Sequence, residues 1–119
     1  MNTTVAQGKI GRFISIQPVR FGYIVRFVVE KLPAWDSTIY CNVEVTLSSN
    51  AEPDSPQLKL NFLHATEVKV GDLNATVGCV VAIQDISDRG LENTTYRVVD
   101  EESLCFSLNC KDFEFAVLE

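Results

Sequence analysis

The chain contains 119 residues, of which 46% are hydrophobic and 22% are charged, and it carries a formal net charge of −6. This length and composition predict a single globular domain spanning residues 1–119 and exclude a wholly disordered chain. The sequence has no apolar run of the roughly 18 residues that a membrane-spanning helix needs and no apolar segment typical of a secretion signal, so we expect a cytoplasmic protein.

The negative charge is concentrated in the C-terminal part of the chain. Residues 1–70 carry a net charge of +1, whereas residues 71–119 carry −7. Proteins bind nucleic acid mainly by neutralising its phosphates with basic side chains, so this balance disfavours a nucleic acid partner. It favours a basic protein partner instead.

The N-terminal run KIGRFISIQPV, residues 9–19, is expected to form a strand, and its glycine suggests a bulge. Ile10, Ile14 and Ile16 lie on one side of such a strand, although Phe13 interrupts the alternation. No window of the chain shows a clear helical period of apolar residues.

The following segments alternate apolar and polar residues with the period of a β-strand. The clearest is TIYCNVEVTL, residues 38–47, in which every second side chain is apolar. The same pattern recurs in residues 22–31, 58–62, 76–85, 95–99, 103–110 and 112–118. Consecutive short strands separated by turn-forming residues predict a mainly β fold, an antiparallel β-sandwich or flattened barrel of about seven to eight strands with little helix.

The cysteines carry no metal-binding signature in the sequence. Cys41, Cys79, Cys105 and Cys110 form no C-x-x-C pair and lack the ligand spacing typical of zinc sites. In a cytoplasmic protein they are expected to be thiols rather than disulfides. We therefore predict neither a metal site nor a cofactor.

The sequence also lacks the signatures of a catalytic site. The single histidine, His64, continues the apolar parity of the run 58–62, which favours a structural role. No Gly-x-Ser-x-Gly motif or glycine-rich phosphate loop accompanies it. The sequence thus predicts a protein that is not an enzyme, although a small hydrolase that uses His64 stays open as an alternative.

The acidic stretch DISDRGLENTTYRVVDEES, residues 85–103, contains six carboxylates and two arginines. Its spacing does not match the calcium loop of helix-loop-helix proteins, although a sandwich can bind calcium through several loops. Solvated loop charges or contacts to a basic partner are the other interpretations. The candidate partner-binding residues are Asp85, Asp88, Glu92, Asp100, Glu101 and Glu102, with Trp35, in the loop after Pro33, as a weaker candidate.

The C-terminal half resembles small bacterial immunity-type proteins of polymorphic toxin and contact-dependent growth inhibition systems. In that family, a strand ending in I-x-D-I leads to a strand with Y-x-V-x-D-E-E and to a final F-x-C-x-x-F-E strand. The matching positions lie within residues 58–115, and they are Ile83, Asp85 and Ile86, then Tyr96, Val98, Asp100, Glu101 and Glu102, then Phe106 or Leu108 with Cys110, Phe113 and Glu114.

This resemblance implies a cytoplasmic protein without catalysis that binds and neutralises a cognate toxin, such as a basic nuclease. The acidic C-terminal part fits such a partner independently, because opposite charge steers association. A ligand- or calcium-binding β-sandwich module is the alternative from another functional class.

Overall fold

The computed structural model describes residues 2–33, 39–50, 52, 54–71, 78–90, 94–102 and 105–118, with side chains from residue 8 onward except that of Ile39. In chain order, the elements are α1 (Asn2–Ser15), η1 (Pro18–Arg20), β1 (Tyr23–Pro33), β2 (Ile39–Ser48), β3 (Gln57–Val70), β4 (Val81–Asp85), η3 (Ser87–Arg89), β5 (Tyr96–Asp100), β6 (Phe106–Cys110) and β7 (Asp112–Leu118). The strands pair antiparallel throughout, which confirms the mainly β fold.

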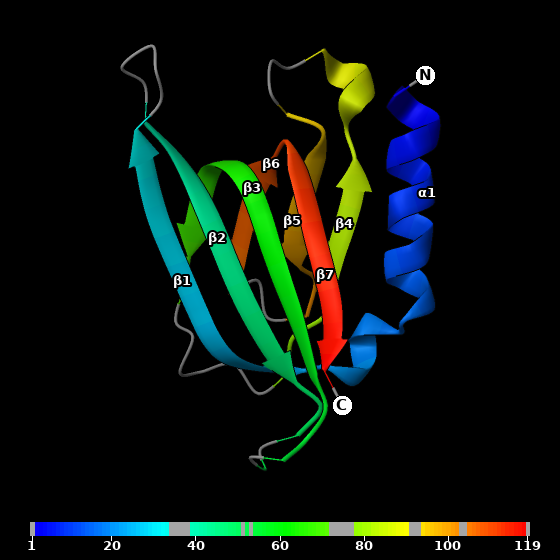
Figure 1. The fold of residues 1–119 in the computed structure, drawn as a ribbon, viewed down its shortest axis with the longest axis vertical. Helices are drawn as coiled ribbons and strands as arrows, with labels where there is room; N and C mark the ends of the chain where they lie inside the picture. The colour runs from blue at the N-terminus through cyan, green and yellow to red at the C-terminus, as the bar shows by residue number, and fades with distance from the viewer. Residues whose placement is uncertain are drawn as a thin grey trace.

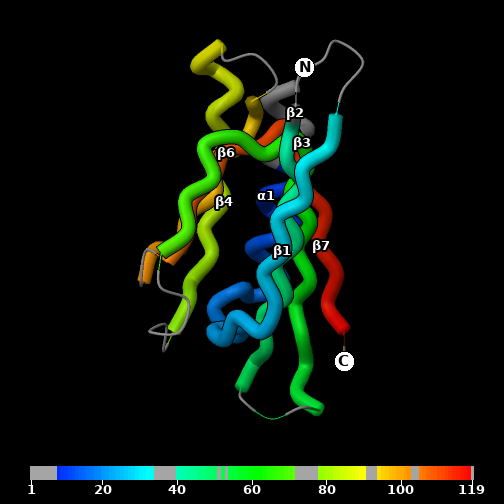
Figure 2. Tube along the Cα trace, turned by 90° about the vertical axis from the view of Figure 1, so that its left-hand side faces the viewer, coloured from blue at the N-terminus to red at the C-terminus, as the bar shows by residue number. Residues whose placement is uncertain are grey.

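The strands form one sheet that bends into two layers, and β3 belongs to both. The first part of β3 lies between β2 and β7, with β1 beyond β2, whereas its last residues pair with β6. From β6 the second layer continues through β5 to β4. Figure 1 shows the layer β1-β2-β3-β7 in front of the other, and the side view in Figure 2 separates the two layers.

Two bulges bend β3 where it passes from one layer to the other. Register shifts interrupt its pairing with β2 and again its pairing with β6. His64 and Glu67 there have positive φ angles of 52° and 51°, and bulges of this kind kink and twist a strand. The bulge takes His64 out of the alternation that the sequence suggested, and its ring stacks on Tyr40 with the ring centroids 4.1 Å apart.

The inner faces of the two layers enclose one hydrophobic core. Alternation correctly predicted which side chains of β2, β3 and β7 face inward, among them Val43, Leu60 and Phe113. Phe27 of one layer meets Phe106 of the other edge to face, with ring centroids 5.3 Å apart. Burying each large apolar side chain contributes about 1.5–3 kcal/mol, so this shared interior holds the layers together.

The prediction of an N-terminal strand was wrong, because residues 2–15 form helix α1. Ile10 and Phe13 are three residues apart, and both pack against the core, as one face of a helix allows. Phe13 is 1% exposed and contacts Phe113 and Phe115 edge to face, whereas Ile14 is 62% exposed. The helix lies along the open side between β7 and β4 (Figure 1).

Candidate functional site

The layer β1-β2-β3-β7 turns a polar face away from the core. The strand registers join Val28 to Glu44, Glu44 to Asn61, and Asn61 to Glu114, so these side chains form one row across four strands. Glu30 and Asn42 form the next pair on β1 and β2. We call this surface the outer sheet face, and it consists of Val28, Glu30, Asn42, Glu44, Lys59, Asn61 and Glu114.

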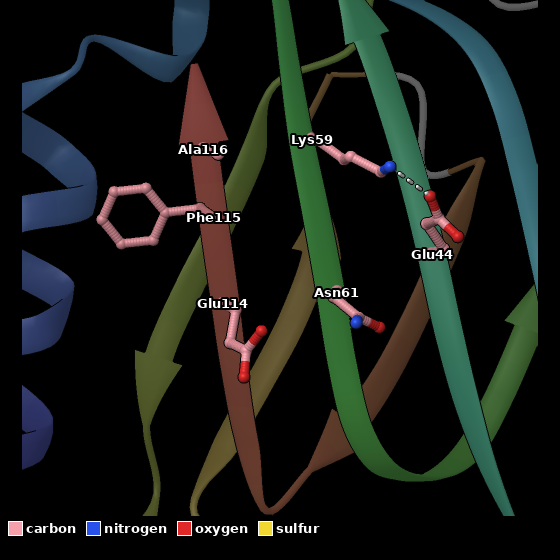
Figure 3. Close-up of a pocket in the computed structure, with 6 residues that line it drawn as sticks. All are labelled: Glu44, Lys59, Asn61, Glu114, Phe115 and Ala116. Atoms are coloured by element: carbon pink, nitrogen blue, oxygen red, sulfur yellow. Dashed lines mark ion pairs between the residues drawn. The ribbon is translucent and has the colours of Figure 1, made fainter. Parts of the chain in front are cut away.

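Two neighbouring hollows run across the outer sheet face. The larger, of about 300 Å³, is lined by Glu44, Lys59, Asn61, Glu114, Phe115 and Ala116 (Figure 3). The smaller, of about 140 Å³, is lined by Val28, Glu30, Asn42, Glu44 and Asn61. Both hollows are lined in part by Glu44 and Asn61, so they adjoin, and we call the two together the strip, which runs from β7 to β1.

The strip is acidic and offers both hydrogen-bond donors and hydrogen-bond acceptors. Lys59, which lines the larger hollow, forms an ion pair with Glu44, with 3.1 Å between Nζ and Oε1 (Figure 3). Glu30 and Glu114 are exposed and form no ion pair with any described residue. The carboxylates and asparagine amides suit the basic and polar side chains of a protein partner, whereas the described lining residues include no histidine, cysteine or serine.

The acidic residues expected from the sequence do not gather on one surface. Asp85 pairs with Tyr96 at one end of the β4–β5 ladder, and Asp100 pairs with Val81 at the other end. Four residues of extended strand, about 13 Å, separate the two ends. Asp88 lies beyond the first end, and Glu101 and Glu102 beyond the second, all three exposed. Glu92 and Trp35 lie outside the described residues.

Asp100 lies inside the protein, so it is not part of any surface that a partner could reach. It is 0% exposed, and its Oδ1 atom accepts hydrogen bonds from the backbone N–H groups of Val80 (3.0 Å) and Glu102 (3.1 Å). Its Oδ2 atom accepts from the backbone N–H of Cys105 (3.2 Å) and from the thiol of Cys105 (2.9 Å). Burial alone would raise the pKa of Asp100, but these donors outweigh it and lower the pKa below the ordinary value.

Asp85 is half-buried and organises the turn that follows β4. Its Oδ1 atom accepts a hydrogen bond from the backbone N–H of Ser87 at 2.8 Å, at the start of η3. Gly90 ends this turn with a φ of 69°, a conformation that glycine adopts without steric cost. A short helical turn thus follows β4, and Asp85 is partly engaged in holding it.

Three residues with metal-binding atoms meet at the other end of the same layer. One donor atom each from Cys79, Asp100 and Cys105 lies within 4.8 Å of the others, and all three residues are buried. Burial, then the charge of Asp100, raises the pKa of the Cys79 thiol far above its ordinary value. None of the four cysteines, all of which the structure describes, forms a disulfide. Sequence spacing missed this cluster because its members come from three separate segments.

No helix of the described residues is long and apolar enough to cross a membrane.

Comparison with known proteins identifies the family. No curated protein and no solved structure matches the chain. The family described as Immunity protein PIM8 matches residues 5–116, nearly the whole length, and this agrees with the immunity-type resemblance of the C-terminal half. The chain therefore belongs to the immunity protein PIM8 family.

Proposed function

We propose that this protein binds the toxin domain of its own system and neutralises it by occupying a functional surface, without catalysis of its own. Membership of an immunity protein family carries the general role. We further propose that the toxin presents a basic surface, such as the cleft of a nuclease, and that both proteins meet in the cytoplasm. The net charge of −6 supports a basic partner.

We place the principal toxin contact on the outer sheet face. This surface of four strands carries two adjoining hollows that are lined by described residues, so it can receive side chains from a partner. Glu30 and Glu114 stand at the two ends of this strip. A lysine or arginine of the toxin that enters the strip would pair with these carboxylates, and the asparagines between them would fix its orientation.

The exposed acidic residues expected from the sequence form a second proposed contact. Asp88, Glu101 and Glu102 keep this role as exposed charges at the two ends of the β4–β5 ladder. Glu92 and Trp35 keep it as sequence-based candidates. Asp100 is removed from this group by its burial.

Co-expression with the toxin tests this function directly. The cognate toxin domain is induced in a host with or without the chain, and growth is followed. We expect growth only with the chain, and a purified one-to-one complex that weakens as salt is raised. Growth arrest despite soluble immunity protein, with no complex at low salt, would refute the neutralising role for that pair.

A further inference from the structure

The end of the layer β4-β5-β6 where those strands meet their connecting segments holds two thiols and a carboxylate. Cys79 precedes β4, Asp100 ends β5, and Cys105 precedes β6. Their exposed fractions are 1%, 0% and 3%, and one donor atom from each lies within 4.8 Å of the others. The backbone N–H groups of Val80 and Cys105 donate hydrogen bonds to the Asp100 carboxylate and hold it against both neighbouring segments.

The spacing of these donors suits a tetrahedral ion. Zinc lies about 2.3 Å from a thiolate sulfur and about 2.0–2.2 Å from a carboxylate oxygen, which separates ligand atoms by about 3.5–3.8 Å. The Sγ atom of Cys105 is 2.9 Å from Oδ2 of Asp100, so their separation would widen by less than about 1 Å as the S–H···O bond is replaced. The other separations are at most 4.8 Å, so they need to change by no more than about 1.3 Å.

The charge balance also allows an ion in this buried place. Two neutral thiols and one carboxylate carry a single negative charge. When a divalent ion binds and each thiol releases its proton to solvent, two thiolates, one carboxylate and the ion again carry a single negative charge. The described hydrogen-bond donors to Asp100 are backbone N–H groups and a thiol, all of them uncharged.

We propose that Cys79, Asp100 and Cys105 bind a zinc-like divalent metal ion through two sulfurs and one oxygen. Thiolate ligands select zinc and similar soft ions over magnesium or calcium. With these three ligands from the described residues, we assign the fourth position to water. Gly78, next to Cys79, is half-buried, and a Cβ built on it would meet no atom of the described residues within 4 Å. The ion would fasten the segments before β4 and β6 to the end of β5.

Cobalt titration tests the site in the full chain. The reduced protein is freed of metal with a chelator and titrated with Co²⁺, whose bonds to thiolates give strong visible and near-ultraviolet absorption. We expect saturation at one ion per chain, displacement by Zn²⁺, and a higher melting temperature with either ion. Cys79→Ser and Cys105→Ser should each weaken Co²⁺ binding at least tenfold, whereas the matched control Cys41→Ser, outside the cluster, should bind as the parent does.

Alkylation of the unmodified protein keeps the test decisive if a serine variant fails to fold. Zn²⁺ should slow the alkylation of Cys79 and Cys105 selectively, with Cys41 and Cys110 as internal controls. Absence of the cobalt–thiolate absorption, equal alkylation with and without Zn²⁺, or a disulfide between Cys79 and Cys105 in the purified protein would each overturn the proposal. None of these readouts involves the toxin, so they test the metal site independently of the neutralising role.

Discussion

Lys9 of α1 reaches across to Asp112 at the start of β7, with 2.5 Å between Nζ and Oδ1. The same ammonium group donates to the backbone carbonyl of Phe113 at 3.1 Å and lies 5.4 Å from the centre of the Phe113 ring. This polar tether fixes the position of the helix along the sheet edge. Because both side chains are partly exposed, the ion pair contributes less than about 1 kcal/mol, and apolar packing must supply most of the docking energy.

Phe13 is therefore the residue whose loss should release α1. Phe13→Ala is expected to lower the free energy of unfolding by about 3–5 kcal/mol, because it leaves a cavity against Phe113 and Phe115. Ile14→Ala, on the exposed side of the same helix, should change it by less than about 0.5 kcal/mol. Urea unfolding followed by circular dichroism measures both, and equal midpoints for the two variants would contradict the docking of the helix.

Helix α1 also shows what local sequence patterns could not predict. The strands could be predicted, because alternation alone places Val43 and Leu60 inward whatever their partners are. In α1, Gly8 and Gly11 lower the helical propensity, and the decisive contact of Phe13 is with residues 100 positions away. The interruption of alternation at Phe13 was the available signal, since residues three apart share a face only in a helix.

The candidate sites depend on pairing that alternation does not specify. The sequence places Glu44, Asn61 and Glu114 on the polar sides of their strands, but only the registers of β2, β3 and β7 align them in one row. Likewise, the row of carboxylates in residues 100–102 reads as solvated, yet the first of them turns inward to backbone donors. The sequence therefore showed which side chains are charged, but it predicted correctly only in part where the fold places them.

Asp100 should be essential for stability. Asp100→Ala leaves the backbone N–H groups of Val80, Glu102 and Cys105 without this acceptor, and the cost is expected to be about 3 kcal/mol or more in unfolding free energy. The neighbouring Glu101→Ala is exposed and should cost less than about 0.5 kcal/mol. Chemical unfolding of metal-free protein compares the two, and a stable Asp100→Ala variant would show that the carboxylate is dispensable to the turn.

Tyr96 should make the fold sensitive to alkali. Burial, followed by the nearby charges of Asp112 and Asp85, raises the pKa of Tyr96 to about 12. The unfolded chain loses this proton near pH 10, so the folded state holds it longer. The contribution of Tyr96 to the free energy of unfolding is therefore fully present below about pH 10, and it is lost as the pH rises toward about 12. Unfolding midpoints across this range should fall less steeply for Tyr96→Phe, and equal slopes for both proteins would contradict the assignment.

Charge reversal on two different surfaces should locate the toxin contact. The double variant Glu30→Lys with Glu114→Lys alters the outer sheet face, and Asp88→Lys with Glu101→Lys alters the ends of the β4–β5 ladder. Both pairs raise the net charge by four, so they weaken long-range attraction to a basic toxin to a similar degree. We expect the first pair to raise the dissociation rate of the complex at least tenfold and to abolish growth protection, because it replaces contacts inside the interface.

The second pair should mainly slow association, an effect that added salt removes. Faster dissociation with the second pair alone would move the principal contact to the acidic ends, whereas normal dissociation with both would exclude these carboxylates from the interface.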